Sequence, residues 1–209
     1  VVLDELDKEL ERRGHRFCRY ADDCNIYVRS QRAGERVMES ITRFITRRLR
    51  LKVNEEKSKV APSRECTYLG YTIGPNGQLR IAPKSKEKMR ARLKELTARN
   101  RGRSLGKVVG ELNRVTRGWI EYFKLAAAKK WRSDTDAWLR RRLRCYRLKQ
   151  CKRKSGIAGF LVARGLRFEW AGAIAGSSKG WYRMSNTPQA TKAMGLEWFR
   201  EIGYIPLTA

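Results

Sequence analysis

The first 82 residues alternate between the hydrophobic spacing of helices and that of strands. A leucine-bearing helix opens the chain and is expected to stop at Gly14. Two strands are predicted next, over residues 16–20 and 24–29, with a short turn between them. A second helix separates them from another pair of strands, whose Asn-Gly step is a strong hairpin signal. This order of elements predicts an α+β fold with antiparallel hairpins.

From Pro83 onward the pattern is helical. A basic helix is expected over residues 84–99, and the side-chain oxygen of Ser104 can cap a second helix. A third helix is expected from Asp134 to Leu148, with its arginines outside the core. The remainder is rich in glycine and aromatic residues and has a less regular periodicity. We therefore predict three parts, namely 1–82, an all-α part over 83–155, and a small C-terminal segment over 156–209.

Composition adds a strong positive charge to this picture. The chain has 48 Lys and Arg against 21 Asp and Glu, a formal net charge of +27. Residues 83–155 hold most of the excess, with 25 basic and 6 acidic side chains. Such an excess favours a polyanionic partner, above all nucleic acid. A membrane partner is disfavoured because no run approaches the roughly 20 apolar residues of a spanning helix, and no signal-peptide pattern opens the chain.

Cysteine and histidine usage excludes several kinds of site. The five cysteines form no C-x-x-C pair, which favours neither a disulfide framework nor a zinc site. Reduced thiols in a cytoplasmic protein are therefore expected. Because His15 is the only histidine, metal sites and acid–base pairs built on several histidines are excluded. The first residues already belong to an amphipathic helix, which indicates a piece of a longer protein.

Two adjacent carboxylates, Asp22 and Asp23, lie at the predicted turn between the first two strands. Neighbours in a regular strand point to opposite faces, but a tight turn can aim both toward a common point. Carboxylate oxygens suit Mg²⁺, which keeps several waters and is completed by substrate phosphates. Two such ions can activate a 3′ hydroxyl and stabilise a leaving pyrophosphate. An ordinary solvated turn is the alternative, because Asp is common in turns.

Four motifs resemble, in the same order, those of group II intron reverse transcriptases. Tyr20-Ala21-Asp22-Asp23 is similar to the YxDD box, and residues 51–59 (LKVNEEKSK) are similar to the LxxNxxKT-type motif that follows it. Tyr68-Leu69-Gly70-Tyr71 resembles the F-L-G-Y box of the primer-grip hairpin. Leu112-Asn113-Arg114 with residues 117–123 (RGWIEYF) resembles the maturase-specific region. The C-terminal residues are also similar to the ends of these proteins, so the resemblance covers essentially the whole chain.

The resemblance implies an RNA-directed DNA polymerase that also assists the splicing and mobility of its intron RNA. It implies the end of a palm over 1–82 and a thumb or maturase domain over 83–155. Asp22 matches the metal-binding catalytic Asp and Asp23 its neighbour, while Lys57 matches a lysine near the incoming triphosphate. A plain surface charge is the alternative for Lys57. The primer end would be supported by Tyr68, Leu69, Gly70 and Tyr71, with a plain core strand over this stretch as the alternative. Group II intron RNA and an RNA template with its DNA primer are the implied partners.

The resemblance also implies groups that this sequence does not show. The family has another catalytic Asp on an earlier palm strand and a fingers region, both further upstream than the 19 residues before Tyr20 allow. The two-ion Mg²⁺ site is therefore expected to be incomplete in this chain. The H-N-H endonuclease of many relatives is not expected, since His15 is the only histidine. We expect the chain alone to bind RNA without polymerising.

Basic residues of the helical part are the candidates for RNA contacts. Each phosphate that they neutralise would release counterions, so affinity would fall steeply with salt. The candidates are Lys84, Lys86, Lys88, Arg90, Arg114, Arg117, Arg140, Arg141, Arg142, Arg144 and Arg147. A solvated charged face is the alternative for them. For the whole chain, the alternatives are a general basic nucleic-acid-binding module with no catalytic role and a remnant that does not fold alone.

Overall fold

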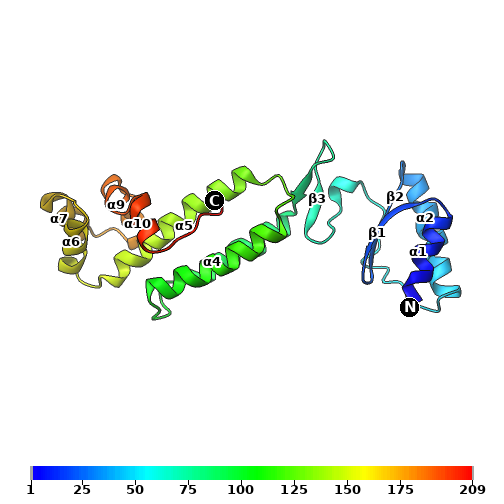
Figure 1. Ribbon diagram of the computed structural model, residues 1–209, viewed down its shortest axis with the longest axis horizontal. Helices are drawn as coiled ribbons and strands as arrows, with labels where there is room; N and C mark the ends of the chain where they lie inside the picture. Colours follow the sequence, from blue (N-terminus) through cyan, green and yellow to red (C-terminus); the bar gives the residue numbers. More distant parts are fainter. Residues whose placement is uncertain (1, 209) are drawn as a thin grey trace. The chain divides into compact units, whose positions relative to one another are not determined.

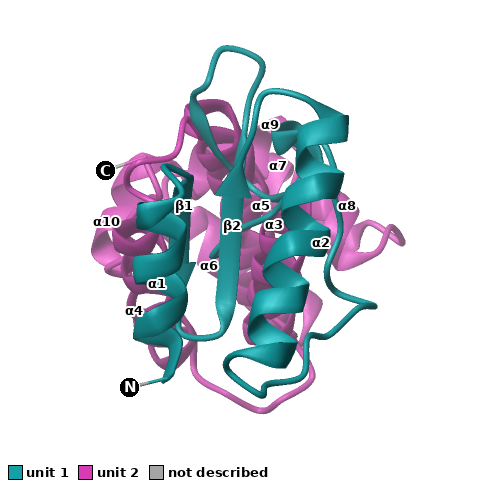
Figure 2. Ribbon diagram, turned by 90° about the vertical axis from the view of Figure 1, so that its right-hand side faces the viewer, with its two compact units in different colours: residues 1–82 teal, residues 83–209 magenta. Residues whose placement is uncertain are grey.

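A computed structural model describes residues 2–208, and the chain divides into two compact units between Ala82 and Pro83 (Figure 2). Unit 1 comprises residues 1–82 and unit 2 residues 83–209. Unit 1 combines helices with two small antiparallel hairpins, whereas unit 2 consists, over residues 83–208, of helices and loops (Figure 1). The predicted α+β class, with a mixed part followed by an all-α part, is confirmed.

The elements of unit 1 follow the predicted order. They are α1 (Val2–Arg12), β1 (Arg16–Tyr20), β2 (Asp23–Tyr27), α2 (Gln31–Arg47), β3 (Tyr71–Ile73) and β4 (Leu79–Ile81), with a 3-10 turn at Ser63–Glu65. Strand β2 ends two residues earlier than expected. The chain leaves the strand there because Ser30 caps α2, and its side-chain oxygen accepts a hydrogen bond from the amide of Ala33 at 3.2 Å.

The core of unit 1 lies between the helices α1 and α2 and one face of the β1–β2 hairpin. Its buried residues are Leu6, Leu10 and Ile41, with Phe17, Cys24 and Ile26 packed against them. Phe17 pairs directly with Ile26, so the strand alternation places both on the helix side. Tyr20 pairs with Asp23 on the opposite face, and both side chains are exposed. The acidic motif therefore faces away from the core.

Unit 2 has three long helices followed by shorter ones. They are α3 (Pro83–Leu96), α4 (Leu105–Tyr122), α5 (Lys129–Gln150), α6 (Lys154–Ala163), α7 (Phe168–Gly176), α8 (Trp181–Met184), α9 (Pro188–Ala193) and α10 (Leu196–Glu201). Ser104 caps α4 as predicted, accepting from the amide of Lys107 at 3.3 Å. Helix α5 begins five residues before its expected start, and the glycine-rich stretch, for which no element was predicted, forms short helices.

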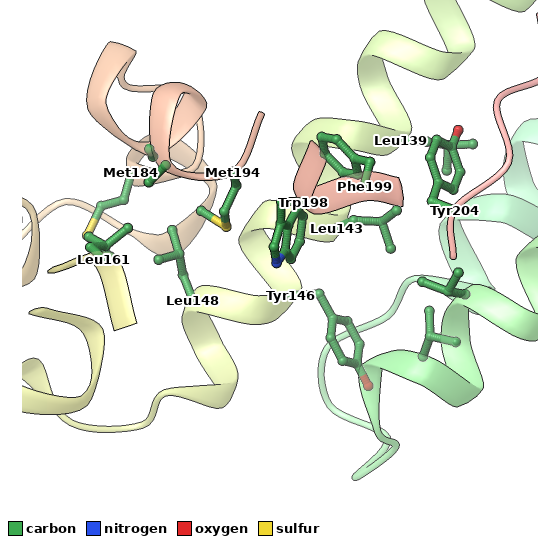
Figure 3. Close-up of a cluster of buried hydrophobic side chains, with 14 of the residues drawn as sticks. Leu139, Leu143, Tyr146, Leu148, Leu161, Met184, Met194, Trp198, Phe199 and Tyr204 are labelled. Carbon is green, nitrogen blue, oxygen red and sulfur yellow. The ribbon is translucent and has the colours of Figure 1, made fainter. Parts of the chain in front are cut away.

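One hydrophobic core joins the long helices to the C-terminal stretch of unit 2. Leu139 and Leu143 of α5 are fully buried, and Met194 and Trp198 from the end of the chain belong to the same cluster (Figure 3). Because they share this core, residues 83–155 and 156–208 form one compact unit. Within residues 2–208, no helix has both the length and the apolar character needed to cross a membrane.

Asp136 of α5 anchors the C-terminal tail from inside this core. Its buried carboxylate accepts hydrogen bonds from the hydroxyls of Tyr204 (2.7 Å) and Thr208 (3.0 Å) and from the amides of Leu207 (2.8 Å) and Thr208 (3.1 Å). Burial, followed by the nearby Asp136 carboxylate, raises the pKa of Tyr204 well above its usual range. The tyrosine therefore stays a neutral donor that holds the tail on α5.

Candidate functional site

The first motif folds as a tight turn between β1 and β2. Since Tyr20 pairs with Asp23, Ala21 and Asp22 form a two-residue loop. Ala21 has a φ of 53°, a left-handed conformation that costs a residue with a Cβ about 1–2 kcal/mol. Positive φ at the first loop position is typical of a type II′ hairpin turn, which favours glycine there. Asp22 and Asp23 are both exposed, so a ligand can reach their carboxylates.

Arg19 braces this turn from β1. Its guanidinium donates two hydrogen bonds to the carboxylate of Asp7 on α1, one of them from Nε to Oδ1 at 2.6 Å. A third hydrogen bond, of 2.8 Å, runs from the same guanidinium to the carbonyl oxygen of Ala21. Hydrogen bonding to Arg19 lowers the pKa of Asp7, so the pair stays charged. Arg19 and Asp7 were not predicted, because no local pattern links residue 7 to residue 21.

The exposed carboxylates of Asp22 and Asp23 are of the kind that could contribute ligands to an Mg²⁺ ion. Two carboxylates suffice for an ion that keeps several waters and takes substrate phosphates. Across residues 2–208, no group of three His, Cys, Asp or Glu side chains comes together to hold a metal ion. A two-ion arrangement would require at least one further carboxylate beside Asp22 and Asp23.

The second motif contains an exposed turn. Asn54 accepts a hydrogen bond from the amide of Lys57 through its side-chain oxygen (3.1 Å) and another through its backbone carbonyl (3.3 Å). The Lys57 side chain is exposed, and in the described part of the chain no hydrogen bond or ion pair joins it to Asp22 or Asp23. Its role beside a triphosphate therefore stays a prediction.

The third motif is a tight turn where a continuous strand was expected. Tyr68 and Tyr71 exchange two backbone hydrogen bonds of 2.9 Å, and Leu69 and Gly70 between them have φ values of 50° and 78°. Positive φ at both loop positions defines a type I′ hairpin turn. Burial raises the pKa of Tyr68, and Asp23 is among the side chains on β1 and β2 that act in the same direction. The role of this turn at the primer end stays a prediction.

The fourth motif lies on α4 and helps to build the core of unit 2. The ring centroid of Trp119 is 4.7 Å from that of Phe123 and 4.8 Å from that of Trp131. Phe123 is buried, whereas Tyr122 is 54% exposed. Most of these aromatic side chains are therefore structural.

Asn113, in the same motif, anchors the C-terminal tail. Its Nδ2 donates to the carbonyl of Gly203 at 2.7 Å, and its Oδ1 accepts from the amide of Ile205 at 3.1 Å. The motif thus gives the tail a second anchor beside Asp136. The motif could be recognised in the sequence, but this contact could not be predicted, because residues 113 and 205 are far apart along the chain.

Two α5 arginines predicted to bind RNA are instead bonded inside the protein. Arg144 is 8% exposed and donates Nε to the carbonyl of Ser185 at 3.0 Å. Arg142 donates to the carbonyls of Lys94 (3.0 Å) and Thr97 (3.2 Å) and so caps the end of α3. Burial lowers the pKa of both guanidiniums, although an arginine in a protein remains charged. Both guanidiniums therefore have structural partners within unit 2, and an RNA contact for either of them stays a prediction.

The other predicted arginines of α5 are also partly buried. The guanidinium of Arg141 lies 3.8 Å from the ring centroid of Tyr182, and that of Arg147 lies 4.4 Å from the ring centroid of Phe160. Arg140 is half-buried as well. The exposed members of the predicted set are on α3 and α4 and comprise Lys84, Lys88, Arg90, Arg114 and Arg117, while Lys86 is half-buried beside them.

Two family models match the chain, in the order of its units. One, described as reverse transcriptase (RNA-dependent DNA polymerase), matches residues 1–73. The other, described as group II intron, maturase-specific domain, matches residues 86–163, which run from α3 to the end of α6. A comparison with curated proteins found no match. Together with the fold, the two models define a reverse-transcriptase-related protein with a helical maturase region. The chain belongs to the group II intron reverse transcriptase/maturase family.

Proposed function

We propose that the chain binds group II intron RNA through the exposed basic residues of α3 and α4 in unit 2 and thereby assists folding and splicing of that RNA. The uneven charge carries this proposal, because residues 83–209 have 31 basic and 9 acidic side chains whereas residues 1–82 have 17 and 12. Within residues 2–208, the exposed cations on α3 and α4 named above take part in no ion pair. Each is therefore available to neutralise a phosphate.

Fluorescence anisotropy with labelled nucleic acids tests RNA binding. A folded group II intron RNA should bind more tightly than unstructured RNA or duplex DNA of equal length at about 0.2 M salt, where non-specific binding is weak. Replacing Lys84, Lys88 and Arg114 by Gln should lower the slope of log affinity against log salt by about one for each lost phosphate contact. Lys192→Gln, on α9, is the matched control. Equal affinity for all three nucleic acids would instead support a general basic nucleic-acid-binding module.

We also propose that Asp22 and Asp23 hold Mg²⁺ as part of a reverse-transcriptase site. Their exposure on a turn braced by Arg19 supports this role. When bound with substrate phosphates, the ion would favour attack by a 3′ hydroxyl and loss of pyrophosphate. Lys57 would contact the triphosphate, and the turn at residues 68–71 would support the primer end.

By itself the chain is proposed to bind RNA without extending a primer. The support is that residues 2–208 place no third acidic side chain where it could share a metal ion with Asp22 and Asp23. The purified chain, given Mg²⁺, deoxynucleotides and a bound template–primer, should give no extension product. Extension that disappears in Asp22→Ala would overturn this proposal, and the RNA-binding proposal would stand.

A further inference from the structure

A groove of about 520 Å³ runs between α3 and α5 in unit 2. This volume lies within the range of about 300–1,000 Å³ that is usual for small-ligand sites. On the α3 side, the groove is lined by Lys86, Arg90 and Lys94. These cations share one helix face because they are spaced four residues apart. On the α5 side, the wall is formed by Trp131 and Trp138. The groove therefore combines a row of cations with two indole rings.

The charges of the groove are largely uncompensated. Glu87 is the only acidic residue that lines it. In the described part of the chain, Lys86, Arg90 and Lys94 form no ion pair. Arg142 also lines the groove, but its hydrogen bonds to the end of α3 hold it in place. The three α3 cations therefore remain for an anionic ligand.

The indole rings are held in position by their neighbours. Trp131 packs against Trp119, with ring centroids 4.8 Å apart. The guanidinium of Arg90 lies 4.8 Å, and that of Arg142 5.1 Å, from the ring centroid of Trp138. Such cation–π contacts fix both the ring and the planar guanidinium. Aromatic rings and guanidinium planes are the surfaces on which unpaired nucleobases stack.

We propose that this groove takes an unpaired nucleotide of the bound RNA. Its base would stack on the Arg90 guanidinium, which the Trp138 ring holds in place, and its flanking phosphates would meet Lys86 and Lys94. A duplex keeps its bases stacked inside and so offers only phosphates to the cations. This inference rests on the proposed RNA binding. It specifies which RNA structure the groove prefers, namely a single-stranded loop or bulge.

Two substitutions test the groove, with affinity measured by anisotropy for a hairpin RNA carrying an unpaired loop and for a blunt RNA duplex of equal length. Trp138→Leu should weaken loop binding by about tenfold, because the ring that holds the Arg90 stacking surface is lost, and should leave duplex binding unchanged. Trp170→Leu replaces an exposed indole on α7, outside the groove, and is the matched control. Arg90→Lys keeps the charge but removes the planar guanidinium, so it should also weaken loop binding selectively.

Crosslinking locates the base directly in the unmodified protein. A single 4-thiouridine in the RNA loop should crosslink, on irradiation, to peptides of α3 or α5 that line the groove. Wild-type protein that binds RNA but crosslinks only elsewhere overturns the groove proposal and leaves the RNA-binding proposal standing. The groove proposal is also wrong if Trp138→Leu and Arg90→Lys, shown folded by their thermal transitions, weaken loop and duplex binding equally or not at all. Wild-type protein that binds no RNA overturns the proposed function itself.

Discussion

The motifs of unit 1 lie on tight turns, whereas the main motif of unit 2 lies on helix α4, where some of its residues are buried and the others are half-buried or exposed. Ala21 and Leu69 have φ values of 53° and 50° although both carry a Cβ. Strained backbone of this kind persists only where surrounding contacts hold it, and it gathers at functional sites. In unit 2, Leu112 is fully buried and Asn113 bonds the C-terminal tail. Motifs that resemble the same family thus form accessible turns in unit 1 and part of the structural framework in unit 2.

This difference predicts different consequences for substitution in the two units. Changes in the buried polar contacts of unit 2 should affect its stability, while changes around the turns of unit 1 should affect local conformation. The two effects can be measured separately, because all six tryptophans lie in unit 2. Tryptophan fluorescence therefore follows unit 2 alone, and the NMR amide signals of residues 16–27 follow the acidic turn of unit 1.

Asp136→Ala should have the largest effect. It leaves two hydroxyls and two amides of the tail without their buried acceptor, which should lower the free energy of unfolding of unit 2 by about 3 kcal/mol. Urea denaturation followed by tryptophan fluorescence measures this loss. Asp134→Ala changes an exposed carboxylate on the same helix and should stay within about 0.5 kcal/mol of wild type. Similar losses in both variants would contradict the anchoring role of Asp136.

Arg19→Gln should have the next largest effect and should act on unit 1. It removes the paired hydrogen bonds to Asp7 and the bond to the carbonyl of Ala21, at a cost of about 2 kcal/mol. The amide signals of residues 16–27 should shift and disappear at lower urea concentration, while tryptophan fluorescence stays unchanged. Arg16→Gln, an exposed arginine of the same strand, is the control. If it perturbs the turn as much as Arg19→Gln does, the bracing role is wrong.

Acid should weaken unit 1 through its paired carboxylates. Hydrogen bonds to Arg12 and Arg13 lower the pKa of Glu9 from 4.5 to about 2, and hydrogen bonding to Arg19 lowers that of Asp7 below 3.8. Because these pKa values are lower in the folded state, their stabilisation is complete above about pH 4.5 and is lost as the pH falls toward 2. NMR signals of residues 16–27, recorded from pH 6 to pH 2, should show the loss. Arg19→Gln should show a smaller change, and an identical pH profile would contradict this.

The smallest effect on the free energy of unfolding is expected for an Ala→Gly substitution, which can be compared between the two units. Ala21→Gly removes the strain of the left-handed conformation but increases the conformational entropy of the unfolded chain. These two contributions to the free energy of unfolding should cancel to within about 0.5 kcal/mol. Ala137→Gly, at an exposed position in α5, should cost unit 2 about 1 kcal/mol. Urea titrations followed by amide signals and by tryptophan fluorescence measure the two. A loss at Ala21 as large as at Ala137 would show that the turn carries no strain.

Local patterns predicted the elements well where neighbouring residues determine them. The β1–β2 hairpin and the cap at Ser104 depend on residues a few positions apart, and both occur as expected. The helices within residues 156–208 were not predicted, because short helices gain their stability from packing against a core, which periodicity does not show. The turn at Leu69 was also missed, since a left-handed leucine is held by its surroundings and not by its own preference.

By itself the sequence determined the charge excess, the order of the elements and the adjacency of Asp22 and Asp23, because these depend on composition and on near neighbours. Only the tertiary structure decided which cations are exposed. Arg144 is buried and bonded within unit 2, whereas Arg90 is exposed and lies over Trp138 in an open groove. The physical reason is that the exposure of a side chain depends on which face of its helix meets the core. Which face meets the core depends on residues that are distant along the chain. Arg19 illustrates such distant contacts, because it binds both Asp7 and the carbonyl of Ala21.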